Sequence, residues 1–143
     1  RDLTVTGVQT CALPIYDAYI MMQKEVGQRL TAKIGTKEYS RLSVMVGVSL
    51  HVEMCFKIPP DVFYPKPKVD SAIIKFSKKE RPLVQDENYV KFNKIVKAAF
   101  SKRRKMLRNS LDAFNISEKI QNEIDFTRRP ETLSIAEFAK LLD

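Results

Sequence analysis

The sequence predicts an α/β unit followed by a small all-helical unit, on two observations. Up to residue 76, short apolar runs alternate with a helical pattern and a proline-rich loop. From residue 87 onward, apolar residues recur mainly three and four positions apart, as on one face of a helix. A polar stretch at residues 77–86 separates the two patterns and contains Pro82. We therefore predict one unit at residues 17–79 and another at residues 84–143.

The first residues differ from the rest of the chain. Residues 1–15 carry one charge of each sign and show no period of 2 or 3.6. We expect residues 1–16 to be a non-native lead-in, with a short native strand and loop as the alternative.

The α/β unit contains five predicted elements besides its loops. The apolar run at residues 18–22 predicts a buried strand. Residues 24–32 predict a helix, because Val26 and Leu30 stand four apart on one face. Residues 42–50 predict a buried helix, although alternating valines leave a strand possible. Residues 53–58 and 71–76 predict strands. The residues at 23–26 follow the first strand directly, where they could line a ligand crevice or simply begin a helix.

The loop between the last two strands is rich in proline and holds adjacent aromatic residues, Phe63 and Tyr64. Its four prolines, which predict a stiff extended loop, are Pro59, Pro60, Pro65 and Pro67. Such a loop could hold aromatic rings for stacking on an extruded base, and Lys66 and Lys68 could contact phosphates. The residues by themselves favour the alternative, a structural loop that packs Phe63 on the core.

The helical unit is predicted from three patterns. Its first helix shows the spacing i, i+3, i+4, i+7, i+8 at Phe92, Ile95, Val96, Ala99 and Phe100. A second helix is predicted at residues 107–114. A last helix is predicted at residues 135–142, with Ser134 as its cap.

Positive charge is concentrated in one stretch. The chain has 25 Lys and Arg against 17 Asp and Glu, a net charge of +8. Residues 87–114 hold eight basic and two acidic residues, a net charge of +6. Five of the seven residues at 102–108 are basic: Lys102, Arg103, Arg104, Lys105 and Arg108. If this stretch is helical, Arg104 and Arg108 stand one turn apart, and arginine suits phosphate. We predict contact with a polyanion, the alternative being a solubilising helix face.

Several classes of protein are not indicated. Cys11 and Cys55 form no CxxC pair and no metal-ligand spacing, and two thiols suit a reducing cytosol. No apolar run approaches the roughly 20 residues that span a bilayer. No Gly-rich phosphate loop occurs, and His51, the only histidine, has no recognisable catalytic partner. We expect a cytoplasmic protein with no metal site and no membrane contact.

Four motifs occur in the order and spacing of the bacterial small-subunit rRNA adenine N6-dimethyltransferases: MMQKEVGQRL, YSRLSVMV, IPPDVFYPKPKVDSAIIKF and AFSKRRKMLRNSL. The chain resembles this family over residues 17–143. The resemblance implies a C-terminal fragment, in which residues 17–79 are the C-terminal edge of an incomplete Rossmann-like methyltransferase domain. Residues 84–143 would then be its helical RNA-binding domain. It also implies methyl transfer from S-adenosylmethionine to N6 of two adjacent adenines in small-subunit rRNA.

The resemblance also implies roles for individual residues. Phe63 matches the aromatic residue that lies beside the target-base pocket in the family. Lys24 and Arg29 match the family's QKEVxxRL segment, while Arg103, Arg104 and Arg108 match its RRKxxRNSL segment. The predicted RNA-contacting set is Lys24, Arg29, Lys66, Lys68, Lys102, Arg103, Arg104, Lys105 and Arg108.

The chain departs from the family pattern in two ways. Ser40 stands where glycine is frequent, and Gly47 where glutamine is frequent. The family's Gly-rich cofactor loop, its ribose-binding acid and its Asn-Leu-Pro-Tyr motif belong upstream, and residues 12–15 imitate that motif without the asparagine. We therefore expect S-adenosylmethionine to serve the complete enzyme but not to bind this chain, which alone should be inactive.

The partner that the resemblance implies is rRNA in the immature 30S subunit, during ribosome biogenesis, with a monomeric complete enzyme. The alternatives are a basic helical RNA- or DNA-binding module and a ribosome-assembly factor without catalysis. A rigid loop beside a base argues against the plain binding module.

Overall fold

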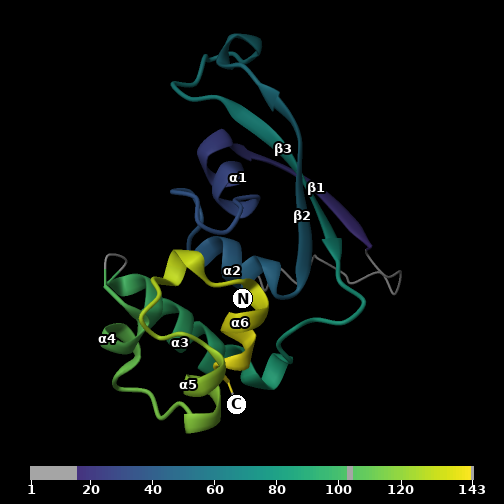
Figure 1. Cartoon of the computed structure of the whole chain (residues 1–143). Coiled ribbons are helices and arrows are strands. Elements are labelled where there is room, and N and C mark those ends of the chain that lie inside the picture. Colours follow the sequence, from purple (N-terminus) through teal and green to yellow (C-terminus); the bar gives the residue numbers. More distant parts are fainter. Residues whose placement is uncertain (1–15, 103–104, 143) are drawn as a thin grey trace, which may run out of the picture.

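The computed structural model describes residues 16–102 and 105–142, and Figure 1 shows a narrow sheet standing above a group of helices. The first part of the chain contains β1 (Asp17–Gln23), α1 (Lys24–Leu30), α2 (Arg41–Gly47), β2 (Leu50–Ile58), the short 3₁₀ helix η1 (Pro60–Val62) and β3 (Ser71–Lys78). The second part contains η2 (Asp86–Asn88), α3 (Tyr89–Ser101), α4 (Leu107–Leu111), α5 (Glu118–Glu123), η3 (Pro130–Thr132) and α6 (Ile135–Lys140).

The sheet is three-stranded and antiparallel, in the order β1-β3-β2. Ile74 in the central strand lies opposite Ile20 of β1 and Met54 of β2. The register between β2 and β3 shifts between Met54 and Phe56, as a β-bulge causes. Ala72 and Ile74 of β3 are fully buried, and Ile74 lies on the face of the sheet that α1 covers. All three predicted strands are therefore confirmed.

The predicted burial of the first strand is wrong. Tyr19, Ile20 and Met21 of β1 are between 47% and 62% exposed. β1 lies at an edge of the sheet, so only one of its sides is paired with another described strand. An apolar run predicts a strand that prefers to be covered, but it does not show whether the covering elements are present.

Helix α1 lies close against the sheet. A Cβ atom on Gly27 would come within 2.7 Å of Cδ1 of Ile74, so only glycine allows the helix to approach this closely. The helix follows β1 directly, and the backbone N–H of Lys24 donates to the carbonyl of Asp70 at 2.9 Å. This hydrogen bond connects the start of α1 to the strand end beside it.

The main hydrophobic core lies in the helical part and extends into the α/β part. The predicted apolar face of α3 is confirmed, since Phe92, Ile95, Val96 and Ala99 are buried. Residues of the first unit join the same core, namely Tyr39, Val44 and Val48. Because one core crosses the predicted boundary, α2 packs with the helical part as well as with α1. The division at residues 79–84 stays a prediction.

Several element ends differ from the predicted ones. The helix predicted at residues 42–50 is α2, which ends at Gly47, and Leu50 already belongs to β2. The polar linker predicted at residues 77–86 is shorter, because β3 continues to Lys78 and Val84 is buried. Helix α4 ends before Phe114, and α5 was not predicted because it is too short to show a period. The predicted cap is confirmed: Glu137 N donates to Ser134 Oγ at 3.1 Å. Of the helices in the described ranges, none has the length and apolarity to cross a membrane.

Candidate RNA interface

The loop at residues 59–70 projects from the end of the sheet that lies farthest from helices α3 to α6 (Figure 1). At its base, Lys24 Nζ lies 2.6 Å from Asp70 Oδ2. Within it, Asp61 and Lys66 form an ion pair, and Phe63 N donates to Pro60 O at 3.2 Å to close η1. The loop is therefore connected at its base and across its width, and its stiffness stays a prediction.

The two adjacent aromatic residues of the loop have different environments. Phe63 is partly buried, whereas Tyr64 is fully exposed. The partial burial of Phe63 is compatible both with packing and with a position at the rim of a base pocket. Its predicted stacking role stays a prediction.

The structure places ion-pair partners beside three of the four basic residues predicted here. Lys24 pairs with Asp70 and Lys66 with Asp61, while Arg29 Nη2 lies 2.6 Å from Glu25 Oε1 one helical turn away. All three pairs are partly or largely exposed, so each is worth only about 0–1 kcal/mol and competes weakly with a phosphate. Lys68 is exposed and has no ion-pair partner in the described ranges.

A basic turn connects α3 to α4. Lys102 and Lys105 are both exposed in it, and Lys105 N donates to Lys102 O at 2.7 Å. Arg108 is exposed in the first turn of α4. Arg103 and Arg104 lie outside the described residues, and so does the predicted one-turn spacing of Arg104 and Arg108. Since α3 ends at Ser101 and α4 begins at Leu107, Lys102 and Lys105 lie outside both helices, whereas Arg108 lies in α4.

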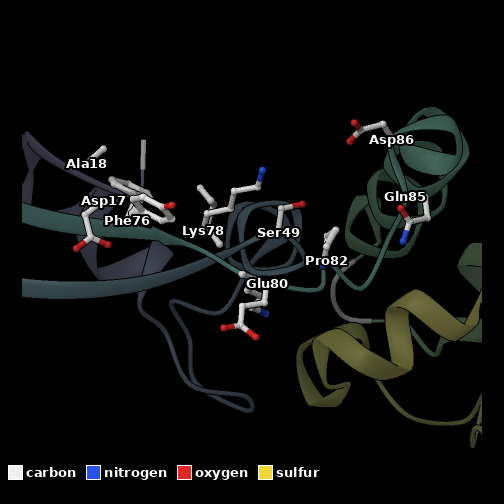
Figure 2. Close-up of a pocket in the computed structure, with 12 residues that line it drawn as sticks. Asp17, Ala18, Ser49, Phe76, Lys78, Glu80, Pro82, Gln85 and Asp86 are labelled. Carbon is white, nitrogen blue, oxygen red and sulfur yellow. The ribbon is translucent and has the colours of Figure 1, made fainter. Parts of the chain in front are cut away.

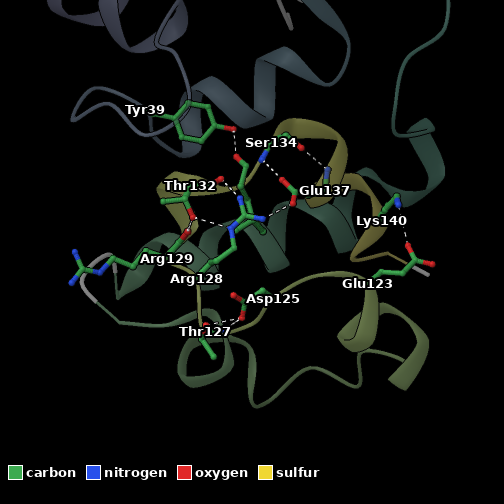
Figure 3. A network of polar contacts seen from close by, with 11 residues as sticks. Tyr39, Glu123, Asp125, Thr127, Arg128, Arg129, Thr132, Ser134, Glu137 and Lys140 are labelled. Atoms are coloured by element: carbon green, nitrogen blue, oxygen red, sulfur yellow. Dashed lines mark hydrogen bonds and ion pairs between the residues drawn. The ribbon is translucent and has the colours of Figure 1, made fainter.

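The start of α4 is held by the segment at residues 126–128. Leu107 N donates to Arg128 O at 3.0 Å, and Arg108 N donates to Phe126 O at 3.1 Å. The Arg128 side chain connects this segment in turn to α6, with Nη1 2.6 Å from Glu137 Oε1 and Nε 3.3 Å from Thr132 Oγ1 (Figure 3). The backbone beside the basic turn is thus anchored to the last helix of the chain.

Arg129 is a candidate that the sequence reasoning missed. It is exposed, and Figure 3 shows its side chain pointing away from the network that holds Arg128. Because the carbonyl of Arg128 accepts from Leu107 N, Arg129 lies in sequence directly beside the backbone contact with the basic turn. The available signal was the dibasic pair before Pro130, which was too short to stand out from the charged surface.

A cavity of about 470 Å³ lies at the opposite end of the sheet from the loop. Figure 2 shows it between the sheet and the linker, with Asp17, Phe76, Lys78 and Pro82 among its lining residues. It is lined by the amino ends of β1 and β2 and by the carboxyl end of β3. The described residues contain no group of three or more potential metal ligands.

Comparisons with known proteins agree on one family. The profile of the ribosomal RNA adenine dimethylases matches residues 3–143. Ribosomal RNA small subunit methyltransferase A from Bacillus thuringiensis (strain Al Hakam) is 45% identical over 139 residues, covering 90% of this chain and 48% of the relative. The protein of the same name from Bacillus cereus (strain B4264) is similar to the same extent.

Solved structures share the fold at lower identity. A dimethyladenosine transferase from Plasmodium falciparum superposes with a TM-score of 0.77 at 24% identity, covering 89% of this chain and 56% of that one. The 23S rRNA methyltransferase ErmE superposes with a TM-score of 0.60 at 22% identity, covering 90% of this chain and 54% of that one.

These matches confirm the predicted fold class, part of an α/β methyltransferase domain joined to helices. The chain belongs to the ribosomal RNA adenine dimethylase family, as its four motifs indicated. It spans about half the length of the curated relatives that it matches. The match from residue 3 overlaps the expected lead-in, whose foreign origin stays a prediction.

Proposed function

We propose that this chain supplies RNA-contacting surface to an enzyme that dimethylates N6 of two adjacent adenines in small-subunit rRNA. The observation that carries the proposal is the basic turn together with the start of α4, where Lys102, Lys105 and Arg108 are exposed and have no ion-pair partner in the described ranges. Unpaired cations on an anchored backbone suit phosphates, which fix position and orientation without reading sequence. Membership of the ribosomal RNA adenine dimethylase family supports rRNA as the polyanion.

In this proposal the loop and the basic turn contact different parts of the RNA. The turn, with Arg129, holds the RNA backbone, while the loop at residues 59–70 presents Phe63 to the target adenine. Adenine inside a duplex is inaccessible, so it has to leave the stack before its amino group can react. The loop is suited to receive it, because its four prolines restrict its backbone.

S-adenosylmethionine is the methyl donor that the family implies for the complete enzyme. In this chain the large cavity lies at the amino end of β1, and no Gly-rich loop occurs in the sequence. We propose that the cofactor is held by other residues and that the chain alone is inactive. The complete enzyme would act as a monomer on the immature 30S subunit in the cytoplasm, during ribosome biogenesis.

A non-catalytic ribosome-assembly factor is the second candidate. It would use the same exposed cations of the basic turn and would need no methyl donor. The two candidates share the RNA contact, so that contact is tested first.

The test compares two double variants that change the net charge equally. Arg103→Glu with Arg104→Glu changes the basic turn, whereas Lys94→Glu with Lys97→Glu changes exposed residues of α3. Filter binding of a small-subunit rRNA hairpin is measured across salt concentrations. Three or four phosphate contacts predict a log–log slope of roughly −2 to −4 for the unchanged chain.

The turn variant should bind more weakly and with a shallower slope, while the α3 variant should keep most of the affinity. If the two variants lost affinity equally, net charge alone would explain the effect. The assignment of the RNA contact to the basic turn would then be overturned. Equal affinities of the unchanged chain and the turn variant at low salt would contradict the RNA contact there.

A further inference from the structure

The ring of Tyr64 is the most exposed large hydrophobic side chain in the described part of the molecule. We propose that Tyr64 stacks on an unpaired nucleotide of the RNA, and that this nucleotide differs from the adenine that Phe63 meets. The loop would then separate two bases by holding one on each side. This inference rests on the proposed RNA contact and adds a positioning residue to it.

The backbone of the loop separates the two rings. Phe63 has φ −109° and ψ 146°, an extended conformation. In extended backbone, successive side chains point to opposite sides. The environments agree with this geometry, since Phe63 is partly buried while Tyr64 is fully exposed. Two rings on opposite sides of one chain cannot both stack on the same base, so an RNA that reaches Phe63 offers Tyr64 a different base.

The ring is also attached to a restrained backbone. Pro65 follows Tyr64 directly, and the Asp61–Lys66 ion pair connects the residues on both sides of it. Residues held in this way lose less conformational freedom when a ligand binds. A fully exposed tyrosine ring on a restrained backbone is therefore preorganised for stacking on a base.

Basic residues of the loop and of the strand end that precedes it favour a nucleic acid over an apolar protein surface. Lys57, near the end of β2, and Lys68, in the loop, are exposed and have no ion-pair partner in the described ranges. Aromatic rings that accompany free cations are the combination by which proteins bind single-stranded nucleic acids, through stacking and phosphate contact. Stacking tolerates every base, so Tyr64 would position the strand without selecting its sequence.

The first experiment uses a fluorescent reporter. The chain has no tryptophan, so Tyr64→Trp introduces a single one at the loop tip. Tyr16→Trp is the matched control, because Tyr16 is also exposed but lies at the opposite end of the sheet. Each protein is titrated with an rRNA hairpin that has unpaired adenines in its loop, and with the same hairpin made abasic in that loop. We expect quenching at position 64 by the first hairpin only, and none at position 16.

The second experiment measures affinity for the same hairpin. Tyr64→Ala should weaken binding of the hairpin by about tenfold, whereas Tyr64→Phe, which keeps the ring, should bind it as tightly as the unchanged chain does. Folding is not at issue, because the replaced side chain contacts little of the protein. The inference is overturned if the unchanged chain binds the hairpin while Tyr64→Trp shows no quenching and Tyr64→Ala binds equally well. In that case the RNA contact of the basic turn still stands. If the unchanged chain does not bind at low salt, both are overturned.

Discussion

The guanidinium group of Arg128 lies 2.6 Å from the carboxylate of Glu137, and this pair connects the segment beside α4 to the first turn of α6. The same carboxylate accepts from Ser134 N at 2.7 Å, while Ser134 Oγ accepts from Glu137 N. One side chain therefore completes the cap of α6 and holds the arginine whose carbonyl supports the basic turn. The ionisation of Glu137 should consequently affect the stability of the whole helical part.

The first prediction concerns acid. Burial opposes ionisation of Glu137, but hydrogen bonds from Ser134 and Arg128 outweigh it and hold the pKa of the carboxyl group below its ordinary value. A lowered pKa stabilises the folded state above the ordinary value of 4.5, and this contribution is lost as the pH falls through the folded-state pKa. Glu137→Gln should lower the free energy of unfolding at neutral pH by about 1 kcal/mol and flatten its decline in acid. Urea unfolding on both sides of pH 4.5 measures this, with Glu87→Gln as an exposed control.

The second prediction concerns alkali. Tyr39 is 1% exposed, and its hydroxyl donates to the carbonyl of Leu133 at 2.9 Å. Burial, assisted by the charge of Glu137, raises the pKa of this phenol well above its ordinary value. Its contribution to stability is therefore complete below pH 10 and is lost as the pH rises further. Tyr39→Phe should lower the free energy of unfolding by about 1 kcal/mol at neutral pH. It should also reduce the further loss of stability above pH 10. Unfolding curves on both sides of pH 10 check this, and the exposed Tyr64→Phe should change neither value.

The third prediction concerns Gly47, which stands where the family frequently has glutamine. A Cβ atom at this position would overlap Cδ1 of Ile135, the first residue of α6. Gly47→Gln should therefore destabilise the chain by about 1–3 kcal/mol through overpacking. Ile135→Ala in the same chain should recover part of that loss, so a double-mutant cycle of thermal unfolding should show coupling. Strictly additive effects would mean that the two residues do not interfere.

The fourth prediction concerns the loop in a chain extended to the full length of the relatives. Phe63→Ala should lower the single-turnover methylation rate on the order of ten- to a hundredfold, because base stacking is worth roughly 1–3 kcal/mol. RNA affinity should change less than the rate, since the basic turn carries the backbone contacts. Phe56→Ala, which removes an exposed phenylalanine of β2, is the matched control. An unchanged rate would show that Phe63 only packs against its neighbours.

Local patterns predicted most of the elements. The cap of α6 requires only Ser134 and a glutamate three positions later, and the buried face of α3 follows from the spacing of its apolar residues. Contacts between residues far apart in the sequence leave no such local pattern. Tyr39 and Leu133 are 94 residues apart, yet their hydrogen bond connects the two predicted units. The burial of β1 was mispredicted for the same reason, because it depends on which elements lie beside the strand.

The candidate site was predicted as a set of charges rather than as a geometry. The sequence indicated that Lys24 and Lys66 are basic and lie near the loop, but it could not show that each has a carboxylate partner. Lys24 and Asp70 are 46 residues apart, and their pairing depends on the β1–β3 register. Family resemblance supplied the role of Phe63, which its residue type alone could not, and that role stays a prediction.

The edge position of β1 has a consequence for handling the chain in solution. In the described part of the molecule, one row of its backbone N–H and C=O groups has no strand beside it, and exposed Tyr19, Ile20 and Met21 flank that row. An open apolar edge is a template for intermolecular strand addition. Concentrated samples should therefore aggregate with the cross-β spacing of about 4.7 Å. Ile20→Lys should slow this process more than Ile34→Lys, which changes a similarly exposed isoleucine outside the sheet.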